Sequence, residues 1–395
     1  MRAVVLGGGG LTGRGAVRQL ASGGLFDEVL CADADLPLAR AAAGAAGPRA
    51  TATGLDVKDR PATVALLRGA DVVVNATPYR LNLAVMAAAL AARVPYLDFG
   101  GLFHTTREQL ALDATFRAAH LLAIPGLGQV PGISNVLTFA AASQLETVES
   151  VVLRDGWRDL RPDGPEIAFT WSPATFLDEM SRPAVVFEDG AYHEHPPLSA
   201  PEEYDFPPPV GRTTVYRTLH SEPATLPESL AAKGLRRCEW KEGGPGVATL
   251  RAVALLGLGS EEAVEVRGSP VVPRELLLAV LRRERLLGPP ADGRVDDWES
   301  LDIELTGSRA GRPAVVHAVA RFPPWPAWNL AATGYAVGTA GAIGAEMIAR
   351  GEIRGEGVVP PERCVPAASF REALKRRGIE TAITPPEPSL PDRGR

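Results

Sequence analysis

Short apolar runs alternate with longer Ala- and Leu-rich segments over the first 135 residues. This alternation predicts β-strands separated by helices, which is typical of a parallel sheet. The expected strands are residues 3–6, 28–33, 51–57, 71–76, 95–99 and 121–126. Six such strands fit an α/β fold with a doubly wound parallel sheet of the Rossmann type. Residues 81–94 are apolar but too few to span a bilayer, so they predict a buried helix.

The pattern changes near residue 150, where strand-like runs are separated by Pro and Gly. These runs predict a second α/β domain with a mixed or antiparallel sheet. Its expected strands are residues 149–157, 166–172, 184–195, 213–220, 248–259, 300–309 and 314–322. The proline-rich residues 204–211 predict a loop. Residues 332–350 and 370–379 predict helices near the end of the chain.

Composition supports a folded protein of two domains, because 395 residues exceed the usual size of one core. Hydrophobic residues make up 46% and charged residues 22%. The net charge of −6 argues against a nucleic-acid partner. Three scattered cysteines predict neither a disulfide framework nor a metal site, and they indicate a reducing cytoplasm. The first strand begins too early for a signal peptide, and neither a membrane span nor a membrane partner is expected.

The clearest motif is the glycine-rich loop GGGGLTG, which directly follows the first expected strand. Gly8, Gly10 and Gly13 fit G-x-G-x-x-G, and Gly7, Gly10 and Gly13 fit a looser G-x-x-G-x-x-G register. Asp33 ends the next strand, 20 positions after Gly13, where a carboxylate can bind the adenosine ribose. Glycines in this position let backbone N–H groups approach a pyrophosphate. The loop therefore predicts a dinucleotide cofactor.

The residues around Asp33 favour NAD over NADP. A carboxylate would repel the 2′-phosphate, and Ala34 stands where NADP-binding proteins often place an arginine. Arg14 and Arg40 could reverse this preference by reaching a phosphate. Asp56 and Val57 could flank the adenine, or they could be a surface carboxylate and a core residue. The other expected cofactor contacts are Leu11, Thr12, Ala76, Thr77 and Pro78.

Two candidate catalytic residues follow neighbouring strands of the predicted sheet. Tyr79 comes directly after the NATP stretch, and Asp98 ends the next strand. Carboxyl ends of parallel strands line the ligand crevice, so both side chains are expected there. For Asp98 a structural hydrogen bond to the following Gly-Gly turn is an alternative. His104 and His220 are further titratable candidates, although a lone histidine is often structural.

Several stretches along most of the chain carry a family resemblance. They are VVLGGGGLTGRG, VNATPYRLNLAVMAAAL, VPYLDFGG, LLAIPGLGQVPGISN, FTWSPATFLDEM and GEGVVPPERCVP. The sequence resembles the saccharopine dehydrogenase family, and within it the lysine 6-dehydrogenase branch. Saccharopine-forming reductases read P-G-I-D-H at the turn where Ser134 and Asn135 stand here. This departure argues against saccharopine itself as the substrate.

The resemblance implies an NAD(P)-binding Rossmann domain over residues 1–135. It implies a substrate-binding and dimerisation domain over residues 136–334, and hence a homodimer. Residues 335–380 would pack back on the first domain. The family's reductases implicate a tyrosine that maps on Tyr79 and an acidic residue that maps on Asp113. A position on an exposed helix face is the alternative for Asp113.

The implied reaction is NAD-dependent oxidative deamination of the terminal amine of an amino acid, with L-lysine as the expected substrate. Oxidation of an amine needs a base for the ammonium proton. Asp98 is the first candidate base, with Tyr79 or His220 as the relay or the alternative.

Asn135, Trp171 and Arg217 lie in text that matches the family's amino-acid pocket, where Arg217 could bind a carboxylate. A surface arginine on an edge strand is the alternative for Arg217. Two other functions stay open. One is a reductive condensation of the saccharopine or carboxynorspermidine type, and the other is a catalytically silent NAD(P)-binding member of the family.

Overall fold

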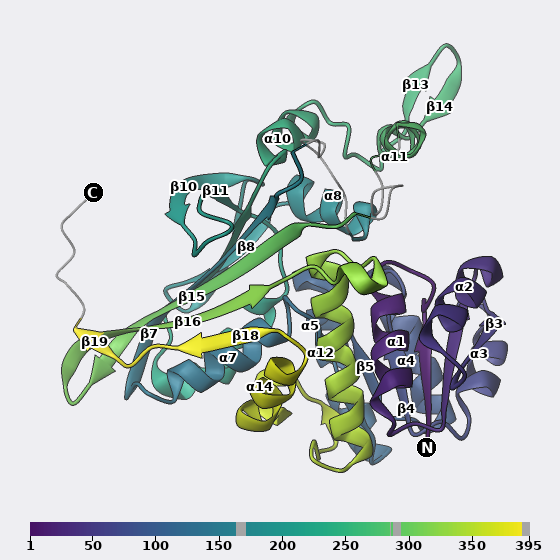
Figure 1. The fold of residues 1–395 in the computed structure, drawn as a ribbon. Helices are drawn as coiled ribbons and strands as arrows, with labels where there is room; N and C mark the ends of the chain where they lie inside the picture. The colour runs from purple at the N-terminus through teal and green to yellow at the C-terminus, as the bar shows by residue number, and fades with distance from the viewer. Residues whose placement is uncertain (163–170, 285, 287–293, 389–395) are drawn as a thin grey trace.

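The computed structural model describes residues 1–162, 171–284, 286 and 294–388. One of its two large sheets contains seven strands, all paired in parallel, in the order β17-β6-β5-β4-β1-β2-β3 (Figure 1). The strands are β1 (Arg2–Leu6), β2 (Glu28–Asp33), β3 (Ala50–Gly54), β4 (Val72–Asn75), β5 (Tyr96–Asp98), β6 (Leu122–Ile124) and β17 (Gly357–Val358). The six strands expected from the sequence are thus confirmed in the doubly wound order 3-2-1-4-5-6.

Helices connect these strands and cover the sheet. They are α1 (Gly13–Gly23), α2 (Leu36–Ala46), α3 (Arg60–Leu67), the short η1 (Tyr79–Leu81), α4 (Asn82–Ala92), α5 (Leu102–Leu110) and α6 (Asp113–Ala118). Local chemistry sets their ends. Asp35 and Asp59 accept hydrogen bonds from the first turns of α2 and α3, and Gly24 ends α1 at φ 77°. The expected buried helix is α4.

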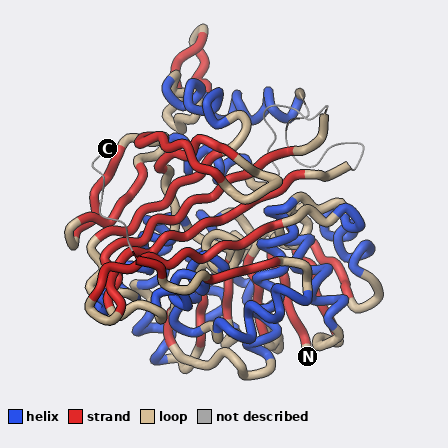
Figure 2. Tube along the Cα trace, turned by 60° about the vertical axis from the view of Figure 1, so that its left-hand side comes forward, coloured by secondary structure: helices blue, strands red, loops and turns tan. Residues whose placement is uncertain are grey.

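Over the described residues, the second large sheet is mixed and has ten strands (Figure 2). Its main order is β10-β11-β12-β7-β15-β16-β18, with β8, β9 and β19 attached. The strands are β7 (Thr147–Asp159), β8 (Ala184–Glu188), β9 (Ala191–His195), β10 (Ser199–Asp205), β11 (Arg212–Arg217), β12 (Arg237–Gly243), β15 (Asp297–Arg309), β16 (Arg312–Phe322), β18 (Glu380–Ile383) and β19 (Glu387–Pro388). Only β12 and β7 pair in parallel within that order, so the prediction of a mixed sheet is confirmed.

The remaining elements follow β6 along the chain. They are α7 (Ile133–Ala142), α8 (Pro173–Ser181), η2 (Glu222–Ala224), α9 (Leu226–Ser229), η3 (Ala231–Lys233), α10 (Val247–Leu255), α11 (Pro273–Arg283), η4 (Pro326–Trp328), α12 (Ala332–Ala349), α13 (Pro361–Cys364), α14 (Ala367–Arg376) and a hairpin of β13 (Val264–Val266) and β14 (Ser269–Val271). No described helix is both long and apolar enough to cross a membrane.

Two strand predictions in this half differ from the structure. Residues 248–259 form most of α10 instead of a strand, because Ala and Leu favour a helix. Residues 184–195 form two strands, β8 and β9, which turn at Asp189 and Gly190 with φ 49° and 87°. Most of the strand expected at residues 166–172 lies outside the described residues.

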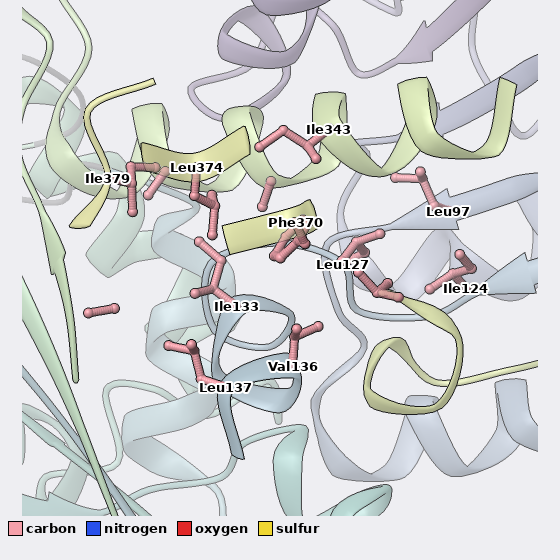
Figure 3. Close-up of a cluster of buried hydrophobic side chains, with 14 of the residues drawn as sticks. Leu97, Ile124, Leu127, Ile133, Val136, Leu137, Ile343, Phe370, Leu374 and Ile379 are labelled. Carbon is pink, nitrogen blue, oxygen red and sulfur yellow. The ribbon is translucent and has the colours of Figure 1, made fainter. Parts of the chain in front are cut away.

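The last part of the chain joins both sheets. Strand β17 extends the parallel sheet beside β6, and β18 extends the mixed sheet beside β16. Helix α12 crosses α1 closely, since a Cβ on Gly338 would lie 2.5 Å from the Ala16 nitrogen. Figure 3 shows the shared core, where Phe370 of α14 lies near Leu127 and Ile133. One hydrophobic core therefore continues from the first sheet to the second.

Candidate active site

A cavity of about 390 Å³ is lined by residues from both halves of the chain. The first half contributes the glycine loop and the ends of β4 and β5, through Gly10, Leu11, Thr12, Ala76, Thr77, Pro78, Tyr79, Phe99 and Gly100. The second contributes the inner face of the mixed sheet and α8, through Asp155, Trp157, Asp159, Trp171, Phe176, Glu179, His220, Glu242, Asp297 and Glu299. Six of the predicted cofactor residues thus share one space with a set of carboxylates.

The glycine loop fits a dinucleotide. A Cβ on Gly13 would lie 2.2 Å from the Gly7 carbonyl oxygen, so this turn requires glycine. A Cβ on Gly10 would meet only the Gly7 oxygen, at 3.2 Å, among the described atoms outside its neighbours, and Gly10 lines the cavity. The first turn of α1 begins at Gly13, so its backbone N–H groups can bind a pyrophosphate here.

The predicted ribose and adenine contacts lie outside the cavity lining, and of these Asp33 contacts the glycine loop. Asp33 ends β2 and accepts hydrogen bonds from the Gly9 and Asp35 nitrogens, both at 3.0 Å. Gly8 hydrogen-bonds through its nitrogen to the Ala32 oxygen, and Ala34 is exposed. Asp56 is exposed, whereas Val57 is buried in the core behind the sheet.

Three adjacent strands of the mixed sheet carry carboxylates on the face toward the cavity. Glu242 on β12 lies directly across from Asp155 on β7. On β15, Asp297 pairs with Asp159 and Glu299 pairs with Trp157 of β7. Side chains alternate along a strand, so the apolar residues of the core and these acids share the inner face. Glu179 of α8 adds a further carboxylate to the same cavity.

Burial changes the acidity of this acidic cluster, which comprises Asp155, Glu179, Glu242, Asp297 and Glu299. Burial, followed by repulsion from neighbouring carboxylates, raises the pKa values of Asp155 and Glu179 well above their usual range. Burial also raises the pKa of Asp297 to about 6 and that of Glu299 to about 7. A positively charged ligand would offset this repulsion and favour the ionised carboxylates.

Several buried oxygens of the cavity lining have no hydrogen-bond partner among the described atoms. They are Asp155 Oδ1, Glu179 Oε2 and Gln129 Oε1, which are acceptors, together with Ser221 Oγ. Unpaired buried acceptors cost free energy and are rare in folded proteins. These oxygens line one cavity, where water or the N–H donors of a ligand can reach them.

His220 is the histidine of the cavity lining and is held from three sides. Its Nδ1 contacts Glu222 Oε2, its Nε2 lies 3.9 Å from Glu179 Oε1, and its ring stacks on Trp240 with centroids 3.9 Å apart. Burial alone lowers the pKa of His220, but Glu222 and Glu242 outweigh it, so the pKa is raised above its usual value. The imidazolium form is therefore favoured next to the acidic cluster.

Tyr79 also lines the cavity, as its position after β4 predicts. Its hydroxyl donates to buried Asp178 at 2.8 Å. Burial and then Asp178 raise the pKa of Tyr79 to about 12. Asp178 also pairs with Arg80 at 2.8 Å and Arg274 at 2.7 Å. Tyr79 is thus a neutral hydrogen-bonding group held at the junction of the two halves.

Three other predicted site residues lie away from the cavity lining. Asp98 is fully buried, and its carboxylate accepts from Tyr96, Gln109, Gly100 and Gly126 at 2.5–2.8 Å. These contacts match the alternative structural role.

Asn135 is buried behind the cavity and hydrogen-bonds to Thr225 and Glu362. Arg217 pairs with Glu239 at 2.7 Å. Glu239 lies on the opposite face of β12 from Glu242, so Arg217 is directed away from the cavity. Trp171, in contrast, lines the cavity beside Phe176, with ring centroids 5.6 Å apart.

The acidic cluster is the feature that sequence reasoning missed. The sequence did contain a signal. Cys238 and Trp240 are buried on the inner face of β12, and because side chains alternate along a strand, Glu242 lies on the same face. On β15, the buried residues Leu301 and Ile303 likewise share a face with Glu299, which lies two residues before Leu301. Acids at inward positions of apolar strands indicate a cavity or a ligand.

The parallel sheet, its glycine-rich loop and the cavity beside it are typical of oxidoreductases that bind a dinucleotide. The family model described as the saccharopine dehydrogenase NADP binding domain matches residues 3–124. The model described as the saccharopine dehydrogenase C-terminal domain matches residues 128–379. The chain belongs to the saccharopine dehydrogenase family, as the sequence motifs indicated.

Two curated relatives act in polyamine chemistry by name. Carboxyaminopropylagmatine dehydrogenase of Synechocystis sp. is 26% identical over 342 residues, which cover 82% of this chain and 83% of the relative. Carboxynorspermidine synthase of Vibrio cholerae is 25% identical over 343 residues, which cover 82% and 79%. These relatives support an oxidoreductase with amine-related substrates. They give no support to the lysine reading and favour the condensation alternative.

Two solved structures share the fold. Saccharopine dehydrogenase (L-Glu forming) of Saccharomyces cerevisiae superposes with a TM-score of 0.75 at 17% identity, covering 97% of this chain and 99% of that one. Homospermidine synthase of Legionella pneumophila, in complex with NAD, gives 0.66 at 15% identity, covering 100% and 93%. The family model that matches residues 3–124 describes an NADP binding domain, so a nicotinamide dinucleotide is the expected class of cofactor.

Proposed function

We propose that this protein catalyses the NAD(P)H-dependent reductive condensation of an aldehyde or keto acid with a primary amine of a diamine or polyamine. The observation that carries the proposal is the acidic cluster, which shares one cavity with the residues expected around the nicotinamide. A free diamine is a dication near neutral pH, so it matches both the charge of this cavity and its unpaired acceptor oxygens.

The reaction consumes one reduced nicotinamide and one proton, and the attacking amine first loses its ammonium proton to solvent. The amine nitrogen attacks the carbonyl carbon, the resulting carbinolamine loses water to form an iminium ion, and hydride addition at that carbon gives a secondary amine. The bound dinucleotide supplies the hydride. In this proposal, the acidic cluster binds the distal ammonium, and His220 gives its Nε2 proton to the departing hydroxyl. Tyr79, whose hydroxyl donates to Asp178, lines the same cavity and accepts a hydrogen bond from the carbinolamine through its oxygen.

For the cofactor, we propose a preference for NAD that rests on Asp33. Its carboxylate is fixed by two backbone N–H groups at the end of β2, where the adenosine ribose is expected. The exposed Ala34 offers no cation to a 2′-phosphate at that position.

A substrate panel tests the function. The decrease of NADH or NADPH absorbance is followed with an aldehyde or keto acid and either 1,3-diaminopropane, putrescine or agmatine. Propylamine is the matched monoamine. We expect a KM at least about tenfold lower for the dications, because one extra charge contact is worth about 1.4 kcal/mol or more. Equal KM values for propylamine and 1,3-diaminopropane would contradict the role of the acidic cluster, and NAD reduction by lysine alone would favour deamination.

A further inference from the structure

The PGISN motif at residues 131–135 supports the back of the candidate active site. Pro131 lines the cavity, but Ser134 and Asn135 lie in the first turn of α7 and are only 0% and 2% exposed. Asn135 accepts from the Gly132 nitrogen at 3.0 Å and donates to Glu362 at 3.1 Å. Asn135 thus fixes the turn itself, and Ser134 is left to face Glu222.

Glu222 is fully buried and connects this motif to His220. Ser134 Oγ donates to Glu222 Oε1 at 2.7 Å, and Glu222 Oε2 contacts His220 Nδ1. The stacked Trp240 ring fixes the plane of the imidazole. With Nδ1 held by a carboxylate, the remaining ring nitrogen, Nε2, is the one directed to Glu179 and the cavity.

Glu222 differs from the other carboxylates around the imidazole. Glu179 from α8 and Glu242 from β12 line the cavity, as does Asp155 from β7, so a bound ammonium group competes with His220 for them. Glu222 is not among the described lining residues. Its negative charge therefore stays with His220 when a cationic substrate binds.

We propose that Glu222, held by Ser134, is a positioning residue that keeps His220 protonated and oriented with its Nε2–H toward the substrate. This inference rests on the proposed function, in which His220 supplies a proton. The arrangement solves a specific difficulty, because an imidazolium next to a bound dication would otherwise lose its proton through repulsion. A shielded carboxylate behind the ring offsets that repulsion.

The test measures the protonation of His220 directly, without substrate. Long-range ¹H–¹⁵N NMR spectra resolve the imidazole nitrogens of the six histidines, and loss of one set in His220→Gln assigns the signal. In Glu222→Gln the titration midpoint of His220 should fall by about 1 to 3 pH units, because an adjacent opposite charge is removed. Glu228→Gln, an exposed carboxylate of the same segment, is the control and should leave the midpoint unchanged.

Glu222→Asp keeps the negative charge but places it farther from His220, because the side chain is one methylene shorter. This variant provides a second test in case Glu222→Gln does not fold. It should lower the midpoint by a smaller amount in the same direction. An unchanged His220 midpoint in either variant would overturn the inference, whatever the protein catalyses.

Turnover adds the second readout. His220 is needed as an acid, so the rate is lost as pH rises through its pKa, and this alkaline limb should move to lower pH in Glu222→Gln with little change in the KM for the amine. If the NMR midpoint of His220 shifts but the protein condenses no amine, the proposed function is wrong, whereas the effect of Glu222 on His220 is supported.

Discussion

Glu299 offers the sharpest quantitative prediction. Its buried carboxylate lowers the stability of the folded protein at high pH, and in the proposed function the same carboxylate binds the substrate ammonium. Thr333 Oγ1 donates to one of its oxygens at 2.5 Å, and the Gln129 side-chain amide donates to the other. Burial nevertheless raises its pKa to about 7 from a usual 4.5. The perturbation is Glu299→Gln, which resembles the protonated, neutral form of the side chain.

The sign and size follow from linkage. Between pH 4.5 and 7 the folded protein holds a proton on Glu299 that the unfolded chain has lost, so the contribution of Glu299 to stability falls as pH rises through this range. A shift from 4.5 to about 7, at about 1.4 kcal/mol per unit, corresponds to about 3 kcal/mol lost at high pH. Glutamine does not ionise. If its amide faces Gln129, the unpaired Gln129 Oε1 can accept from it after an amide flip.

The assay is urea unfolding, followed by tryptophan fluorescence, of parent and variant at pH 5.5 and pH 8.5. The free energy of unfolding of Glu299→Gln relative to the parent should increase by about 2 kcal/mol from the lower to the higher pH. Glu304→Gln changes the opposite face of the same strand and is the matched control. The affinity of Glu299→Gln for a diamine should fall at least about tenfold. A stability difference that is the same at both pH values would refute the reasoning.

Three further predictions concern the cofactor and Asp98. Asp33→Ser combined with Ala34→Arg should shift the ratio of NADH to NADPH affinity toward NADPH, and equal affinities in the parent protein would remove the premise. Gly10→Val should abolish NADH binding in a fluorescence titration because its side chain enters the cavity, whereas Gly44→Ala, at an open helix position, should bind normally. Asp98→Asn should lower the free energy of unfolding by about 2 kcal/mol through lost buried hydrogen bonds while turnover per folded molecule stays near the parent value. A hundredfold loss of turnover at unchanged stability would return the role of base to Asp98.

The sequence predicted the first half of the fold well because its signals are local. Alternating apolar runs fix the strands, and the glycine loop and Asp33 follow from positions at strand ends. The same reasoning placed Tyr79 at the cavity. It also put Asp98 in the crevice, but a strand end does not reveal the donors that converge from Gly126 and Gln109, which are 28 and 11 residues away.

The candidate site in the second half depends on how distant strands pair and in which register, and local sequence patterns do not predict either. Glu242 and Asp155 become neighbours only through the parallel pairing of β12 and β7, 87 residues apart in the chain. Arg217 matched a family motif, but its side chain pairs with Glu239, which lies on the face of the mixed sheet that is turned away from the cavity. Even α10 was missed, because an isolated run of Ala, Leu and Val does not distinguish a helix from a strand.

The most direct measurement of the central claim follows the hydride into the product. The protein is incubated with NADH or NADPH that carries deuterium at the transferable C4 position, an aldehyde or keto acid, and 1,3-diaminopropane, and the products are analysed by mass spectrometry. Reductive condensation predicts a secondary amine whose mass equals carbonyl compound plus amine, less water, plus one hydrogen and one deuterium. Absence of this product with every carbonyl and amine pair, together with ammonia release and NADH formation from lysine and NAD, would contradict the account.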